Sequence, residues 1–164
     1  MGALGRLAVV FGLLSSIAVE VVLPAFARIQ SPHRLRRRYF QIVAGYLTMS
    51  VLSVAVVAVF PSQILSVLGH QYSGLHAEAI LMSACAVVST TAGLLWAVNS
   101  SRAWIVPPAF LIPCTIATQV ASIAFLNLST VKGVLLFTMY SWVPSIVMSI
   151  WFAMNKMWDT PAAA

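Results

Sequence analysis

The sequence predicts an all-α integral membrane protein with about five transmembrane helices. Of its 164 residues, 61% are hydrophobic and 7% are charged, whereas a soluble domain carries about 25% charged residues. So few charged groups cannot cover the surface of a globular domain of this size. The charged residues also stand between apolar runs that are long enough to cross a bilayer. Because backbone groups in lipid must satisfy their own hydrogen bonds, these runs are expected to be helices.

Five apolar runs reach the roughly 20 residues that a helix needs to cross the hydrocarbon. They cover residues 7–27, 39–60, 79–101, 104–127 and 133–155. The apolar core of a signal peptide has only about 7–15 residues, so the first run is expected to be a retained span. We expect residues 1–158 to form a single transmembrane bundle and residues 159–164 to form a short tail.

Single residues support several of these helix ends. Pro61 is expected to end or kink the second helix, and residues 63–69 are expected to form a short helical turn in the membrane interface. Glu78 suits the positive start of the third helix dipole. Pro113 and Pro144 fall inside the fourth and fifth spans, where neighbouring helices can satisfy the carbonyl groups that proline leaves unpaired.

The basic residues are distributed unevenly between the two sides of the membrane. Alternating connections place Arg6 and Lys132 on one side and seven basic residues on the other. The positive-inside rule assigns the seven to the cytoplasm. The N-terminus is then outside and the C-terminus cytoplasmic. The seven are Arg28, Arg34, Arg36, Arg37, Arg38, Arg102 and Lys156.

Two further expectations follow from this charge pattern. An odd number of spans with an outside N-terminus is what remains when a preceding helix is missing, so the chain is expected to be a partial unit. The basic residues lie between apolar spans rather than along one exposed face. Nucleic acid is therefore not expected as a partner.

The stretch RLRRR supplies the main candidate site, with Arg34, Arg36, Arg37 and Arg38. Guanidinium groups match the oxygens of phosphate, so these arginines could bind the pyrophosphate of a lipid-linked sugar. They could instead fix the topology and hold anionic lipid headgroups. The charge asymmetry favours the second role, and the sequence alone leaves both open.

Polar residues inside the spans give two weaker candidates. Glu20 is the only acidic residue within a span, where a carboxylate commonly faces a cavity and could carry a proton or contact substrate. It could also lie near the headgroups and pair with an arginine. Ser89, Thr90 and Thr91 could line a polar cavity, although hydrogen bonding between helices is the more common role of such residues.

No pattern in the sequence predicts a metal, a cofactor or an enzyme. His70 and His76 have no cysteine or aspartate near them and are not expected to bind zinc. Cys85 and Cys114 lack a paired spacing and are expected to pack as small apolar residues. No nucleophile, base and acid stand in a recognisable arrangement.

Three stretches resemble polysaccharide flippases of the MOP superfamily, which also holds the MATE-type drug antiporters and the lipid II flippase. Residues 22–28, VLPAFAR, resemble the Leu-Pro end of one helix in this family, and residues 34–40, RLRRRYF, resemble the basic and aromatic entry to the next. The stretch FPSQILSVLG at residues 60–69, with Tyr72, is similar to the family's P-x-x-I-L-x-x-L-G-x-x-Y segment. The resemblance covers roughly residues 1 to 155.

The resemblance implies that the chain matches the last five helices of a twelve-helix transporter, whose two pseudo-symmetric halves enclose a central cavity. The implied function is translocation of a polyprenyl-diphosphate-linked oligosaccharide for cell-surface polysaccharide biosynthesis. The implied partners are membrane lipids and a separate N-terminal half or another copy of the chain. Two alternatives stay open: a MATE-type cation-coupled exporter of small molecules, and a non-transporting membrane subunit of glycan assembly.

Overall fold

The structure is a computed structural model that describes residues 12–13, 16, 19–21, 23–29, 31–63 and 76–159. Within these residues all regular structure is helical, and four helices are long and apolar enough to cross a membrane. They are α2 (Pro32–Val59), α4 (His76–Ser100), α5 (Pro108–Phe125) and α6 (Val131–Asp159). The prediction of an all-α membrane protein is confirmed, and the chain is a multi-pass membrane protein.

The first expected span, residues 7–27, lies only partly in the described chain. Its residues 12–13, 16, 19–21 and 23–27 are helical, and the rest of the range is outside the part that the structure describes. A fifth crossing therefore stays a prediction. The same holds for the interfacial turn expected at residues 63–69, because only residue 63 of that range is described and it is helical.

The second helix begins at Pro32, seven residues before the start that the apolar run predicts. Ser31 has extended backbone angles (φ −74°, ψ 122°) and serves as the N-cap, and proline follows in the first helical turn, where its fixed φ suits a helix start. The charge-free run predicts only the part of the helix that crosses the hydrocarbon. The helix itself is longer, because it continues into the headgroup layer. The arginine cluster is therefore helical.

The fourth expected helix begins later than predicted, at Pro108 instead of residue 104. Pro107 is its N-cap and has an extended ψ of 130°, because the residue before a proline is sterically kept out of the helical region. Four residues named in the sequence lie where they were expected. α2 ends at Val59, just before Pro61, and Glu78 lies in the first turn of α4. Pro113 and Pro144 lie inside α5 and α6.

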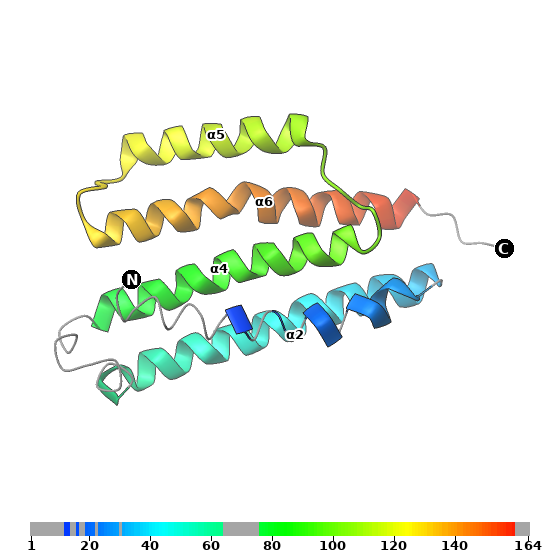
Figure 1. The fold of residues 1–164 in the computed structure, drawn as a ribbon, viewed down its shortest axis with the longest axis horizontal. Coiled ribbons are helices and arrows are strands. Elements are labelled where there is room, and N and C mark those ends of the chain that lie inside the picture. Colours follow the sequence, from blue (N-terminus) through cyan, green and yellow to red (C-terminus); the bar gives the residue numbers. More distant parts are fainter. Residues whose placement is uncertain are drawn as a thin grey trace.

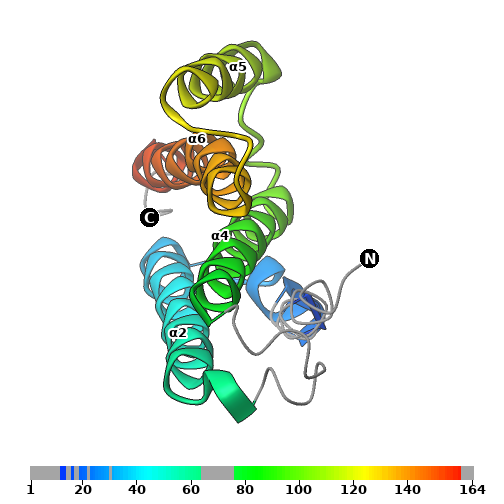
Figure 2. The ribbon, with the colours of Figure 1, turned by 90° about the vertical axis from the view of Figure 1, so that its left-hand side faces the viewer.

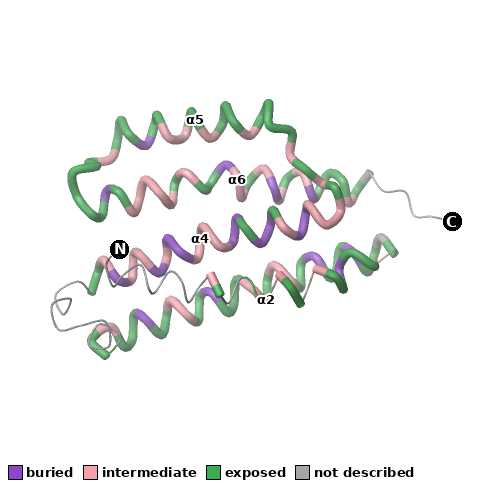
Figure 3. Tube along the Cα trace, in the orientation of Figure 1, coloured by how far each residue is buried: buried purple, intermediate pink, exposed green. Residues whose placement is uncertain are grey.

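The helices lie side by side in the order α2, α4, α6, α5 (Figures 1 and 2). α4 is the central helix: 44% of its most apolar stretch is buried, against 6% to 11% for the other three. Figure 3 shows the buried positions gathered along α4. The start of α2 and the ends of α4 and α6 share one end of the bundle, which we call the arginine end.

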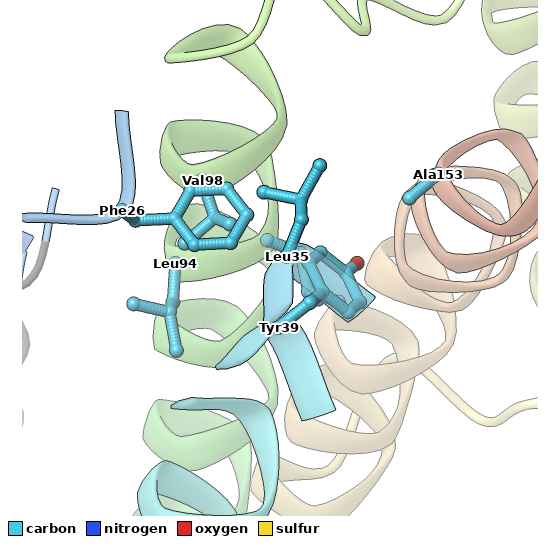
Figure 4. Close-up of a cluster of buried hydrophobic side chains, with 7 residues drawn as sticks. Phe26, Leu35, Tyr39, Leu94, Val98 and Ala153 are labelled. Carbon is cyan, nitrogen blue, oxygen red and sulfur yellow. The ribbon is translucent and has the colours of Figure 1, made fainter. Parts of the chain in front are cut away.

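A cluster of buried side chains holds the arginine end together (Figure 4). Leu35 and Tyr39, one helical turn apart on α2, pack with residues of α4 and with Ala153 of α6. Phe26 joins them from the segment before α2, and its ring centroid lies 6.3 Å from that of Tyr39. Such tight side-chain packing is the main force between helices in lipid, because the tails are as apolar as the side chains.

Candidate functional site: an arginine pocket at one end of the bundle

An open pocket of about 730 Å³ lies beside the start of α2. We call it the arginine pocket. Its volume is within the range of about 300–1,000 Å³ that is typical of ligand sites. Two segments line it: the end of the segment that precedes α2, and one face of α2 itself. The lining residues are Arg28, Ile29, Ser31, Arg34, Arg37, Arg38 and Gln41.

The spacing on α2 explains which arginines reach the pocket. Residues 34, 37, 38 and 41 follow the i, i+3, i+4, i+7 pattern and therefore share one helical face. Arg36 is on a different face. Its guanidinium carbon lies 4.4 Å from the ring centroid of Trp158, near the end of α6, a cation–π contact. The structure thus brings three of the four predicted arginines together and separates Arg36 from them.

The electrostatics of the arginine pocket favour an anion. Arg28, Arg34, Arg37 and Arg38 are exposed, and none of their guanidinium groups forms an ion pair or hydrogen bond with another described residue. The N-cap residue Ser31 makes no side-chain hydrogen bond to the first-turn N–H groups of α2, and this turn contains no acidic residue. The N-terminal end of a helix dipole is itself positive. The four guanidinium groups and the positive end of the helix dipole therefore all favour a negatively charged ligand.

The pocket's chemistry matches phosphate oxygens more closely than a single carboxylate. Each guanidinium presents a planar fork of donors that binds two oxygens at once. Because several guanidinium groups surround one pocket, a ligand that carries two or more negative charges should bind most tightly. A diphosphate meets this requirement, and so does the phosphate of a lipid headgroup.

The weaker candidates lie away from this pocket. The Glu20 side chain is exposed, does not line the arginine pocket and pairs with no arginine among the described residues. His76 is exposed at the start of α4, toward the opposite end of the bundle, and His70 lies outside the described residues. The structure brings none of these residues to the arginine cluster.

The hydroxyl groups in the third span bond within their own helix. Ser89 and Thr90 donate to the Ala86 carbonyl oxygen at 3.0 and 2.8 Å, and Thr91 donates to that of Val87 at 2.7 Å. Each hydroxyl satisfies its donor three or four residues back, as serine and threonine commonly do in apolar helices. The interpretation that they hydrogen-bond between helices is wrong.

Two residues with long-range contacts were not predicted from the sequence to make such contacts. Arg102, in the connection between α4 and α5, donates to the Phe26 carbonyl oxygen at 2.8 Å and to that of Ile29. Asn99, buried near the end of α4, donates from Nδ2 to the Ser149 carbonyl oxygen of α6 at 2.9 Å. The only sequence signal for either is its polarity next to apolar neighbours. No pattern in the sequence names the partners, which lie 50 to 76 residues away.

No protein-family model, no curated protein and no solved structure gives a significant match to the chain.

Proposed function

We propose that the chain forms one helical bundle of a transporter of the polysaccharide-flippase type. It moves a polyprenyl-diphosphate-linked oligosaccharide from the cytoplasmic to the outer leaflet of a bacterial inner membrane. The arginine pocket receives the diphosphate, and the sugar stays in the aqueous layer beside it. A second bundle, from a separate chain or another copy, completes the transport path.

The observation that supports this proposal is the arginine pocket itself. A lipid-linked sugar is an amphipathic molecule whose charge is concentrated in a diphosphate at the membrane surface. α2 has 28 residues and is therefore about 42 Å long, whereas the hydrocarbon core is about 30 Å thick. The exposed Trp158, which contacts Arg36, is of a residue type enriched at the headgroup level, and this supports placing the arginines at the depth of the diphosphate.

The proposal also assigns a side of the membrane to the arginine end. Six basic residues of α2, α6 and the α4–α5 connection lie there, together with Arg28, while Lys132 lies at the opposite end. The positive-inside rule then gives a cytoplasmic arginine end. This is the leaflet in which a glycan lipid made by cytoplasmic enzymes must be bound before it is moved.

Transport in proteoliposomes tests the proposal. A fluorescent polyprenyl-diphosphate oligosaccharide is reconstituted with the protein, and its movement is followed by quenching with an impermeant reductant. We expect the wild type to accelerate quenching of the inner-leaflet lipid. Arg37→Gln should slow it about tenfold, because one charge-assisted hydrogen bond is lost. Arg36→Gln removes the same charge outside the pocket and should stay close to wild type.

Four results would count against the proposal. Equal quenching with and without folded protein would remove transport by this chain. Equal slowing by Arg36→Gln and Arg37→Gln would remove the pocket as the binding site. Uptake of a cationic dye driven by a sodium or proton gradient, with no movement of the glycan lipid, would favour the MATE-type exporter instead. Binding of the glycan lipid without movement would favour the accessory subunit.

A further inference from the structure

Arg102 connects two parts of the arginine end that are far apart in sequence. It lies in the α4–α5 connection, and its Nη2 donates to the carbonyl oxygens of Phe26, at 2.8 Å, and of Ile29. Its guanidinium carbon also lies 5.4 Å from the centroid of the Phe26 ring. The two carbonyl groups stand on either side of Arg28. Arg28 and Ile29 both line the arginine pocket.

These contacts lie at the C-terminal end of a helical segment. The helical residues before α2 end at Ala27, and the last carbonyl groups of a helix have no partner within it. The Ile29 N–H donates to the Phe26 oxygen at 3.2 Å, and the Arg102 Nη2 donates to that same oxygen and to the oxygen of Ile29. A cation at a helix C-terminus is also favoured by the dipole.

The position of Arg102 is itself fixed by its connection. The N–H groups of Arg102 and Trp104 both donate to the Asn99 carbonyl oxygen, at 3.0 and 2.9 Å. The Asn99 side chain is bonded to α6. Arg102 is half-buried, its Nε has no partner among the described residues, and burial lowers the pKa of its guanidinium, which nevertheless stays protonated at neutral pH. A partly desolvated charge is thus held at one place by the ends of α4 and α6.

We propose that Arg102 is a positioning residue for the arginine pocket, and this inference rests on the proposed function. By holding the carbonyl groups on both sides of Arg28, Arg102 fixes one wall of the pocket against Arg34, Arg37 and Arg38 on α2. Without this hold, repulsion between like charges drives Arg28 away from α2. A ligand must then draw the wall back, and its affinity falls, because the site is no longer preorganised.

Diphosphate binding in nanodiscs tests the inference with a double-mutant cycle. The probes are inorganic pyrophosphate and a polyprenyl diphosphate, and phosphatidylglycerol in the nanodisc tests competition by a bulk headgroup. Arg28→Gln and Arg102→Gln should each weaken pyrophosphate binding by about fivefold to tenfold. If Arg102 acts through Arg28, the double variant should be no weaker than Arg28→Gln alone. Additive losses would overturn the inference.

Arg102→Lys separates position from charge. Lysine keeps the charge, but its shorter, flexible side chain lacks the rigid planar guanidinium that holds Nη2 beside the Phe26 and Ile29 carbonyl oxygens. We therefore expect Arg102→Lys to bind diphosphate as weakly as Arg102→Gln. Wild-type affinity in Arg102→Lys would show that charge alone matters and would overturn the inference. Arg36→Gln, with one charge less at the same end, is the matched control and should bind like the wild type.

A measurement without ligand keeps the inference separate from the proposed function. Hydrogen exchange at the Ile29 amide reports whether the pocket wall stays closed on the Phe26 carbonyl. We expect exchange there to be faster in Arg102→Gln and Arg102→Lys than in the wild type and in Arg36→Gln. If the wild type binds no diphosphate, the proposed function fails while the exchange data still decide the role of Arg102. Unchanged exchange in both Arg102 variants would overturn the inference.

Discussion

Gly133 lies in the first turn of α6, where a side chain has no room. A Cβ added there would overlap the Asn127 carbonyl oxygen and would stand 3.1 Å from the Thr130 Oγ1 atom. The Gly133 N–H donates to that Oγ1 at 3.1 Å, so Thr130 caps the helix as N-cap residues of its type do. The turn between α5 and α6 depends on this close approach of two backbone segments.

Replacement of Gly133 by alanine should therefore destabilise the protein, although alanine is the better helix former. The clash with a backbone carbonyl should cost more than the roughly 1 kcal/mol that helix propensity gains, which leaves a net loss of about 1–2 kcal/mol. Gly93→Ala is the matched control, because Gly93 lies within α4 and has no atom within 4 Å of an added Cβ. Thermal unfolding in detergent should show a lower Tm for Gly133→Ala only. Equal or higher stability would contradict the assigned turn.

At the same scale, the sequence predicted part of the candidate site. The arginine cluster was identifiable because charge is rare in this chain. The separation of Arg36 from Arg34, Arg37 and Arg38 was not, since it depends on the helix continuing beyond the apolar run. The contact of Arg102 with Phe26 joins residues 76 positions apart. Local patterns carry no information on such a contact.

α4 ends in a backbone motif that normally contains glycine. Ala103 has a positive φ of 57°. Its N–H donates to the Ser100 carbonyl oxygen, and that of Trp104 donates to the Asn99 carbonyl oxygen. These two bonds define a Schellman motif with Ala103 at the left-handed position. An alanine in this conformation costs about 1–2 kcal/mol relative to the right-handed form.

Ala103→Gly should relieve this strain and raise the free energy of unfolding. Glycine also has more conformational entropy in the unfolded chain, which lowers the stability by about 0.4–1 kcal/mol. The net increase in the free energy of unfolding should therefore be roughly 0.5–1 kcal/mol. Chemical or thermal unfolding in detergent would measure it. A valine at the same position should be destabilising, because a β-branched side chain fits the left-handed region poorly. If glycine lowered stability, the connection would not have the left-handed turn.

At the scale of elements, helix existence was easier to predict than helix ends. Four apolar runs correspond to α2, α4, α5 and α6, because lipid requires long helices whatever their exact sequence. The starts of α2 and α5 differed from the runs by several residues. At both places a proline and the extended residue before it decide where the helix begins, and neither changes the hydropathy of the run.

Across the whole molecule, charge divides the two ends of the bundle. The arginine end holds Arg28, the four arginines of the α2 start, Arg102 and Lys156, whereas Lys132 is at the opposite end. Translocation of the seven-residue basic group across a membrane would be far more costly than that of a single lysine. The charge distribution therefore predicts that the arginine end faces the cytoplasm.

Cysteine labelling in whole cells would test this orientation. In a variant with Cys85 and Cys114 replaced by alanine, single cysteines would be placed at His33 and at Lys132, both of which are exposed. We expect an impermeant maleimide added outside to modify the cysteine at 132 and to reach the cysteine at 33 only after the cells are opened. Modification at 33 in intact cells would reverse the predicted orientation.

α5 lies at one edge of the row of helices and is the shortest of the four, with 18 residues. Its length is about 27 Å, which is a few ångströms less than the average hydrocarbon thickness of about 30 Å, while its neighbour α6 has 29 residues. Lipid tails beside α5 must therefore shorten, whereas those beside α2 need not. The ring of lipid around the protein is expected to be thinner beside α5 than beside α2, and the protein is expected to prefer membranes with short acyl chains.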